Sequence, residues 1–170
     1  MRICRIIFGA AVAAAPAYAT NQCDELGALQ ADPNAVSAPV AFDAIDPDAL
    51  IAACSGALQG AGADGARYLL QRARGYLRAG RGDQAMQDFV AAYNLDYPAA
   101  TFALATAYFL GDDVPQNFER ARTLFEQSYD QGVIWSAKGL SMLYENEFKL
   151  VAFSEYRLIG LYKNSKYEND

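Results

Sequence analysis

An internal repeat with a period of 36 residues is the feature that most constrains what this chain of 170 residues can fold into. Six pairs of small, aromatic or aliphatic residues recur at this interval: Ala85/Ala121, Phe89/Phe125, Ala92/Ser128, Leu104/Leu140, Ala105/Ser141 and Tyr108/Tyr144. A fixed period of about 20–50 residues is typical of proteins that stack one supersecondary unit on the next. The repeat therefore predicts a stack of similar units.

The first unit, residues 66–95, has the pattern of a helical hairpin. Residues 66–79 and 83–95 show the three- and four-residue spacing of apolar side chains, and Gly80-Arg81-Gly82 separates them. Asp83 is the expected N-cap of the second helix. Small residues would let the two helices approach closely while aromatic residues fill the space between them. The residues expected in these interior positions are Leu69, Ala73, Tyr76, Ala85, Phe89 and Ala92.

The second unit, residues 99–132, repeats this hairpin with a longer loop. Tyr76 and Ala85 are nine positions apart, whereas Tyr108 and Ala121 are thirteen apart, so four residues have entered the loop between the helices. That loop contains Gly111, then a Val114-Pro115 turn, then Asn117 ahead of the second helix. The pattern over residues 66–144 resembles Sel-one-like repeats, the loop-extended relatives of the tetratricopeptide repeat. The chain as a whole resembles exported bacterial proteins built from such repeats.

The resemblance implies an all-α fold, a right-handed α-α superhelix in which antiparallel hairpins form a short solenoid. The repeat domain is expected over residues 45–162. A capping helix over about 47–59 would begin after Asp46 as N-cap, with Pro47 at the first helical position. The third unit, 134–162, loses the loop pattern after Tyr144 and is expected to be a partial repeat with a closing helix, followed by a polar tail over 163–170.

Residues 1–19 have the pattern of a secretory signal peptide. Arg2 and Arg5 precede an uncharged apolar run, and Ala17-Tyr18-Ala19 forms a small-residue cleavage site. We expect cleavage near Ala19 and export to the periplasm of a Gram-negative bacterium or beyond it. The run is about half the length of a membrane-spanning helix, so no integral membrane anchor is expected.

Two cysteines would remain after cleavage, Cys23 and Cys54, and an oxidising compartment favours a disulfide between them. The alternative is a pair of free, buried thiols. Residues 20–44 contain Pro33 and Pro39 and no helical period. They are therefore expected to form an extended lead-in that the disulfide tethers to the capping helix.

Composition excludes several functional classes. The chain has no histidine, which excludes Ser-His-Asp triads, Cys-His dyads and histidine-ligated zinc or haem sites. Without Arg2 and Arg5, the Lys and Arg count falls from 14 to 12 against 20 Asp and Glu, a net charge of −8. Nucleic acid is therefore not an expected partner.

The resemblance implies that first-helix side chains line a surface that binds a protein or peptide. The candidate residues, taken from the helical period, are Arg67, Gln71, Arg74 and Arg78 in the first unit, Phe102, Thr106 and Phe109 in the second, and Trp135, Lys138 and Met142 in the third. Guanidinium groups and exposed aromatic residues favour an acidic or C-terminal peptide with apolar residues. Two alternatives stay open. The arginines could form a solvated face or pair with the acidic, base-free residues 20–66, and the aromatic residues could belong to the core.

The sequence thus favours a non-catalytic adaptor or regulatory module that binds an envelope protein. The alternative is an envelope enzyme or accessory factor acting on peptidoglycan or polysaccharide, since some muramidases are helical solenoids, but the Glu-Ser-Gly signature of those enzymes is absent. Neither Asp112-Asp113 nor the group Asp43, Asp46 and Asp48 has the spacing of a calcium loop, so no metal and no cofactor are expected. The open ends of so short a stack are expected to allow weak self-association.

Overall fold

The computed structural model describes residues 21–146, and every regular element within that range is helical, which confirms the all-α fold. The elements are α1 (Gln22–Gly27), the 3₁₀ turn η1 (Phe42–Ala44), α2 (Pro47–Leu58), the 3₁₀ turn η2 (Gly62–Asp64), α3 (Gly65–Arg78), α4 (Gly82–Tyr93), α5 (Pro98–Leu110) and α6 (Phe118–Asp130). A further helix begins at Ser136 and continues to the limit of the described range at residue 146.

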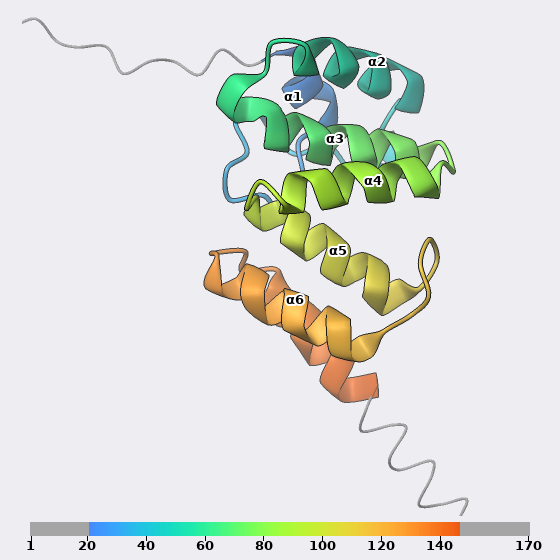
Figure 1. Cartoon of the computed structure of the whole chain (residues 1–170), viewed down its shortest axis with the longest axis vertical. Coiled ribbons are helices and arrows are strands. Elements are labelled where there is room, and N and C mark those ends of the chain that lie inside the picture. Colours follow the sequence, from blue (N-terminus) through green and yellow to red (C-terminus); the bar gives the residue numbers. More distant parts are fainter. Residues whose placement is uncertain (1–20, 147–170) are drawn as a thin grey trace, which may run out of the picture.

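From α2 to α6 the helices stack in the order in which they occur along the chain, and α1 packs against both α2 and α3 (Figure 1). The closest packing joins α3 to α4, α5 to α6 and α2 to α3, while α4 and α5 connect the two hairpins. Because each helix packs mainly on its neighbours in sequence, the chain forms a linear stack, and this packing is consistent with a superhelical arrangement. The position of α2 on α3 agrees with the expected capping helix. The right-handed sense of the superhelix stays a prediction.

Local capping chemistry explains where two of these helices begin. Asp46 Oδ1 accepts a hydrogen bond from the Ala49 amide at 3.2 Å, and Pro47 is the first residue of α2, as the sequence predicts. Asn117 Oδ1 accepts from the Arg120 amide at 2.9 Å at the start of α6. The preceding loop leaves α5 through Gly111, whose φ of 78° suits glycine because it has no Cβ.

The predicted N-cap of the second helix, Asp83, is wrong. Helix α4 begins one residue earlier, at Gly82, and its N-cap is Arg81, whose side chain makes no capping hydrogen bond. The reason lies in the turn that ends α3. Gly80 has a φ of 70°, and the Arg81 amide donates to the Tyr76 carbonyl at 2.8 Å, so the chain has already reversed by Arg81. Asp83 therefore falls inside the first turn of α4.

Small residues let the helices approach, as the repeat pattern predicts. Ala73, Ala85 and Ala92 are fully buried in the first hairpin, and Phe89 fills the space beside them. Ala105, Ala121, Phe125 and Ser128 occupy the equivalent positions in the second hairpin, and all four are buried. A Cβ added at Gly139, in the helix that begins at Ser136, would lie 2.5 Å from the Phe125 ring, so this glycine permits a close approach to α6.

The extended lead-in predicted for residues 20–44 is wrong in part. Residues 22–27 form α1, which begins with a capping box. Asn21 Oδ1 accepts from the Asp24 amide at 3.1 Å, and the Asp24 carboxylate accepts from the Asn21 amide. A helix of six residues is too short to show a hydrophobic period, which is why the sequence pattern did not reveal it. Residues 28–41 are irregular, as expected.

The predicted disulfide joins α1 to α2. Cys23 and Cys54 are bonded at an S–S distance of 2.03 Å, and both side chains are buried. Ile45, Leu50 and Tyr68 pack around the bond and form a small core separate from that of the two hairpins. The predicted signal peptide, the closing helix predicted to follow the partial repeat and the polar tail lie outside the described residues.

Candidate functional site

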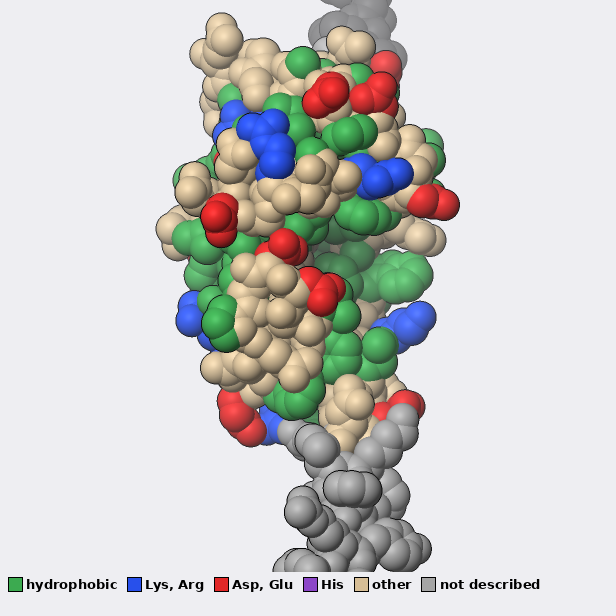
Figure 2. Space-filling model, turned by 90° about the vertical axis from the view of Figure 1, so that its right-hand side faces the viewer, with side chains coloured by type: hydrophobic (Ala, Val, Ile, Leu, Met, Phe, Trp, Pro, Cys, Tyr) green, Lys and Arg blue, Asp and Glu red, His purple; other side chains and the backbone are tan. Residues whose placement is uncertain are grey.

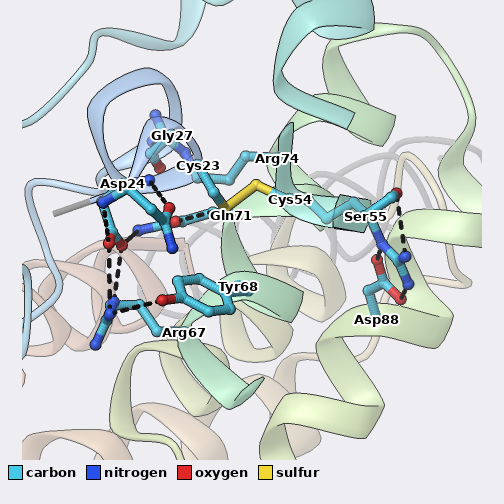
Figure 3. The surroundings of a disulfide bond; sticks show 12 residues. Cys23, Asp24, Gly27, Cys54, Ser55, Arg67, Tyr68, Gln71, Arg74 and Asp88 are labelled. Carbon is cyan, nitrogen blue, oxygen red and sulfur yellow. Dashed lines mark hydrogen bonds and ion pairs between the residues drawn. A yellow bond between two sulfur atoms is a disulfide. The ribbon is translucent and has the colours of Figure 1, made fainter. Parts of the chain in front are cut away.

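The chain's own N-terminal segment (residues 21–45) covers the first-helix face of the first hairpin (Figure 3). Asp24, fully buried in α1, accepts from Arg67 Nε at 2.8 Å and from Gln71 Nε2 at 3.1 Å. Arg67 Nη1 also donates to Asp64 at 2.8 Å. Burial lowers the pKa of Arg67, but hydrogen bonding and the charge of Asp24 outweigh it and raise the pKa above its ordinary value. The guanidinium is therefore a cation held by the N-terminal segment.

Arg74 fixes the other half of this segment. Its Nη1 donates to the carbonyls of Gly27 and Ala28 at 2.6 and 2.7 Å, and its Nη2 donates to the Val40 carbonyl at 2.8 Å. Burial lowers the pKa of Arg74 to about 10, so the group is still charged at neutral pH. A charged guanidinium can satisfy several carbonyls at once, which lets an irregular segment be buried without a regular hydrogen-bond ladder.

The predicted ligand-binding role of Arg67, Gln71 and Arg74 on an exposed face is therefore wrong. Their exposed fractions are 7%, 1% and 6%. The helical period identified the correct face of α3, but the N-terminal segment already occupies it. The alternative of pairing with acidic residues of the N-terminal region is confirmed for Arg67, whereas Arg74 bonds to backbone carbonyls instead. Arg78, at the C-terminal end of α3, is exposed.

Arg72, between Arg67 and Arg74 on α3, is also paired, with a residue of α4. Arg72 donates from Nε and Nη2 to the two carboxylate oxygens of Asp88 at 2.7 and 2.8 Å, a bidentate contact between α3 and α4. It also donates to Ser55 of α2 at 3.3 Å. The arginine-rich stretch is therefore largely an internal framework that joins α1, α2 and α4 to α3.

An apolar groove of about 240 Å³ lies beside the N-terminal segment, and side chains of α3 and α5 line it. Leu29 and Phe42 of the N-terminal segment contribute to the lining together with α5. On the face shown in Figure 2, hydrophobic side chains gather in a hollow about halfway along the molecule, with acidic side chains beside it. The complete lining is Leu29, Phe42, Leu70, Arg74, Leu77, Phe89, Phe102, Ala103, Thr106, Ala107, Leu110, Asp112 and Asp113.

The groove brings together only some of the predicted site residues. Phe102 and Thr106, both half-buried, line it as the candidate surface requires. Phe109 does not belong to the surface, because it is 9% exposed and packs against Phe118 and Phe125 at centroid distances of 5.8 and 6.5 Å. For Phe109, the alternative of a core position is confirmed.

The predicted residues of the third unit lie apart from this groove. Trp135, Lys138 and Met142 are exposed, on or just before the helix that begins at Ser136, and they are not in the groove lining. Their spacing of three and four residues places Lys138 and Met142 on one face of that helix. Sequence reasoning thus identified one continuous surface where the structure has two separate regions.

Several groove residues were missed. Leu110 follows Thr106 by four positions and Phe102 by eight, so the helical period could have included it, and it is 53% exposed. Asp112 and Asp113 entered the sequence analysis only as candidate metal ligands, whose spacing does not fit a calcium loop. Leu29 and Phe42 carry no signal in the sequence, because an irregular segment has no period that says which side chain faces a neighbour.

A further buried polar contact joins the N-terminal segment to Tyr97, the residue that precedes α5. Asp32 is buried and accepts from the Tyr97 hydroxyl at 2.7 Å and from the Asn34 amide at 2.9 Å. Burial raises the pKa of Asp32 despite these hydrogen bonds, and it also raises the pKa of Tyr97. Within residues 21–146 no three or more Cys, Asp or Glu side chains gather in a group that could hold a metal ion.

No helix in the described part of the chain is long and apolar enough to cross a membrane. Comparisons of the chain with protein-family models, with curated proteins and with solved structures found no match.

Proposed function

We propose that this protein is a non-catalytic, exported adaptor or regulatory module that binds a segment of an envelope protein in the groove beside α5. The single observation that carries the proposal is the apolar groove itself. Phe102, Thr106 and Leu110 lie along one face of α5, and Leu29 and Phe42 of the N-terminal segment contribute to the same lining.

The size and lining of the groove favour a peptide side chain over a small molecule. Pockets that enclose small-molecule ligands usually measure about 300–1,000 Å³, and this groove is smaller, at about 240 Å³. Two large apolar residues at its edge, Phe42 and Leu110, are 48% and 53% exposed. Partly exposed apolar residues around a concave site are typical of surfaces that accept an anchor residue of a partner.

The resemblance to Sel-one-like and tetratricopeptide repeats supports the same proposal, because proteins of those families bind peptides along first-helix faces. In this chain the groove belongs to the first-helix face of the second hairpin, since the N-terminal segment covers that of the first. Export is supported by the disulfide between Cys23 and Cys54 and by the signal-peptide pattern of residues 1–19.

The proposal is tested by selecting peptides from a displayed random library on the purified protein and measuring their affinity for two variants. Ala107→Phe places a ring in the groove, whereas Ala137→Phe makes the same change at an exposed position outside it. We expect Ala107→Phe to weaken binding at least tenfold and Ala137→Phe to leave it unchanged. Binding that tolerates Ala107→Phe, or a library that yields no binder, would contradict the proposal.

A further inference from the structure

We propose that the groove recognises a partner segment in which a large apolar side chain is followed within a few residues by Lys or Arg, and that Asp112 and Asp113 contact that cation. This inference rests on the proposed function, and it names the chemistry of the ligand. It replaces the acidic peptide expected from the sequence, because Arg67 and Arg74, which suggested that ligand, are buried and paired.

Among the polar side chains that line the groove, the carboxylates of Asp112 and Asp113 are the ones that can recognise a ligand. Of the thirteen lining residues, only Arg74, Thr106, Asp112 and Asp113 are polar. Arg74 is 6% exposed and donates to three backbone carbonyls of the N-terminal segment. The Thr106 hydroxyl donates to the Phe102 carbonyl at 3.0 Å, within the same helix. Asp112 and Asp113, by contrast, are exposed.

The loop between α5 and α6 places these carboxylates beside the groove. It leaves α5 through Gly111, where an added Cβ would lie 2.7 Å from Gln116 Cβ. The Gln116 side chain donates to the Phe109 carbonyl at 2.9 Å, and the Asn117 amide donates to the Tyr108 carbonyl at 2.9 Å. The loop is therefore held at both of its ends.

Asp113 also lies against the start of α4. A Cβ added at Gly82 would collide with the Asp113 carboxylate, so this side chain packs on the first residue of that helix. The four residues that distinguish the second loop from the first thus carry an acidic pair to the end of the groove. The insertion changes the chemistry of the site as well as the loop length.

The charge of the surrounding protein favours the same ligand. Residues 21–146 contain 8 Lys and Arg against 16 Asp and Glu. Such an excess of acid repels acidic segments and increases the rate at which basic segments associate. An exposed ion pair strengthens binding by about two- to fivefold, so we expect selectivity from the carboxylates and most of the affinity from the apolar anchor.

The experiment uses three immobilised pools of ten-residue peptides that are alike except at one position. Each peptide has a fixed Phe, and the residue three positions later is Lys in one pool, Gln in the second and Glu in the third. The purified full chain is passed over each pool at low and at high salt. We expect about fivefold tighter retention on the Lys pool than on the Gln pool, weakest retention on the Glu pool, and a loss of this difference at high salt.

Matched double variants locate the effect. Asp112→Asn with Asp113→Asn should reduce the Lys preference to less than twofold, whereas Glu126→Gln with Asp130→Asn, which removes the same charge from α6, should keep it. Equal retention on all pools, a preference for Glu, or the same loss in both double variants would overturn the ligand assignment. If Ala107→Phe leaves retention on every pool unchanged, the groove is not the binding site and the proposed function fails instead.

Two other occupants are distinguished by a photo-cross-linking amino acid placed at Leu110 of the protein alone. A cross-link to residues 147–170 of the same molecule would mean that the chain fills its own groove. A cross-linked dimer would mean that a second copy does. Either product at stoichiometric yield would overturn the assignment to a separate partner, and the proposal expects neither.

Discussion

The first-helix faces of the two hairpins differ in what covers them, although both follow the same repeat. On α3 the face carries Arg67, Gln71 and Arg74, and the N-terminal segment is bound to all three. On α5 the equivalent face carries Phe102, Thr106 and Leu110, and these residues line a groove that no described residue fills. One face is polar and occupied, and the other is apolar and open.

The difference shows how one scaffold can use the same face in two ways. The polar side chains of α3 can satisfy the backbone carbonyls of an irregular segment, so they hold 21–45 in place. That segment in turn supplies Leu29 and Phe42 to the groove beside α5. The segment that covers the first-helix face of α3 therefore also forms part of the groove beside α5.

The largest expected effect concerns Arg74. Arg74→Ala should lower the free energy of unfolding by about 3–5 kcal/mol, because it removes the guanidinium donor of the Gly27 and Val40 carbonyls and leaves the Ala28 carbonyl with the Val40 amide alone. Chemical denaturation followed by circular dichroism measures the change. Arg78→Ala, an exposed change on the same helix, and Leu110→Ala on the open face should each stay within about 1 kcal/mol of the parent. An Arg74→Ala protein as stable as these controls would contradict the account of the occupied face.

The next effect concerns the disulfide. Replacing Cys23 and Cys54 together by Ser should lower the free energy of unfolding by about 3–4 kcal/mol, the chain-entropy value for a loop of this size. The damage should be local. Hydrogen exchange measured by mass spectrometry should speed up in residues 21–45 while α5 and α6 keep their protection. A uniform increase along the whole stack would mean that the two faces are not independent.

The smallest effect is a pH dependence from Asp32. Burial raises the pKa of this carboxyl in the folded state, so the folded protein binds the proton more tightly than the unfolded chain does. The ionised form therefore costs stability above the raised pKa, and that cost disappears as the pH falls toward the ordinary value of 3.8. Relative to Asp32→Asn, the parent should gain stability between pH 7 and pH 4 in urea denaturation. A difference between the two proteins that does not change with pH would refute this assignment.

Helix positions were predictable wherever local chemistry specifies them. Asp46 with Pro47 identifies the start of α2, and Asn117 identifies the start of α6, because capping depends on residues within one turn. The prediction failed at Asp83, where the tight turn at Gly80 brought the next helix forward by one residue. It also missed α1, whose six residues are too few for a hydrophobic period.

The candidate surface was predictable only as a set of helix faces. The period placed Phe102 and Thr106 on the side of α5 that lines the groove, but it could not distinguish Phe109, which packs in the core against Phe118 and Phe125. A period of 3.6 residues gives the direction of a side chain relative to its own helix. It contains no information about which distant segment lies opposite.

The sequence by itself determined the all-α fold, the two hairpins and the pairing of Cys23 with Cys54. A repeat of 36 residues, local capping and the single pair of cysteines outside the predicted signal peptide, which contains Cys4, depend on no long-range detail. Only the tertiary structure decided that Arg67 and Arg74 are internal and that Leu29 and Phe42 form part of a groove. The physical reason is that buried polar groups must find partners, and an irregular segment reaches those partners by a path that no periodic pattern encodes.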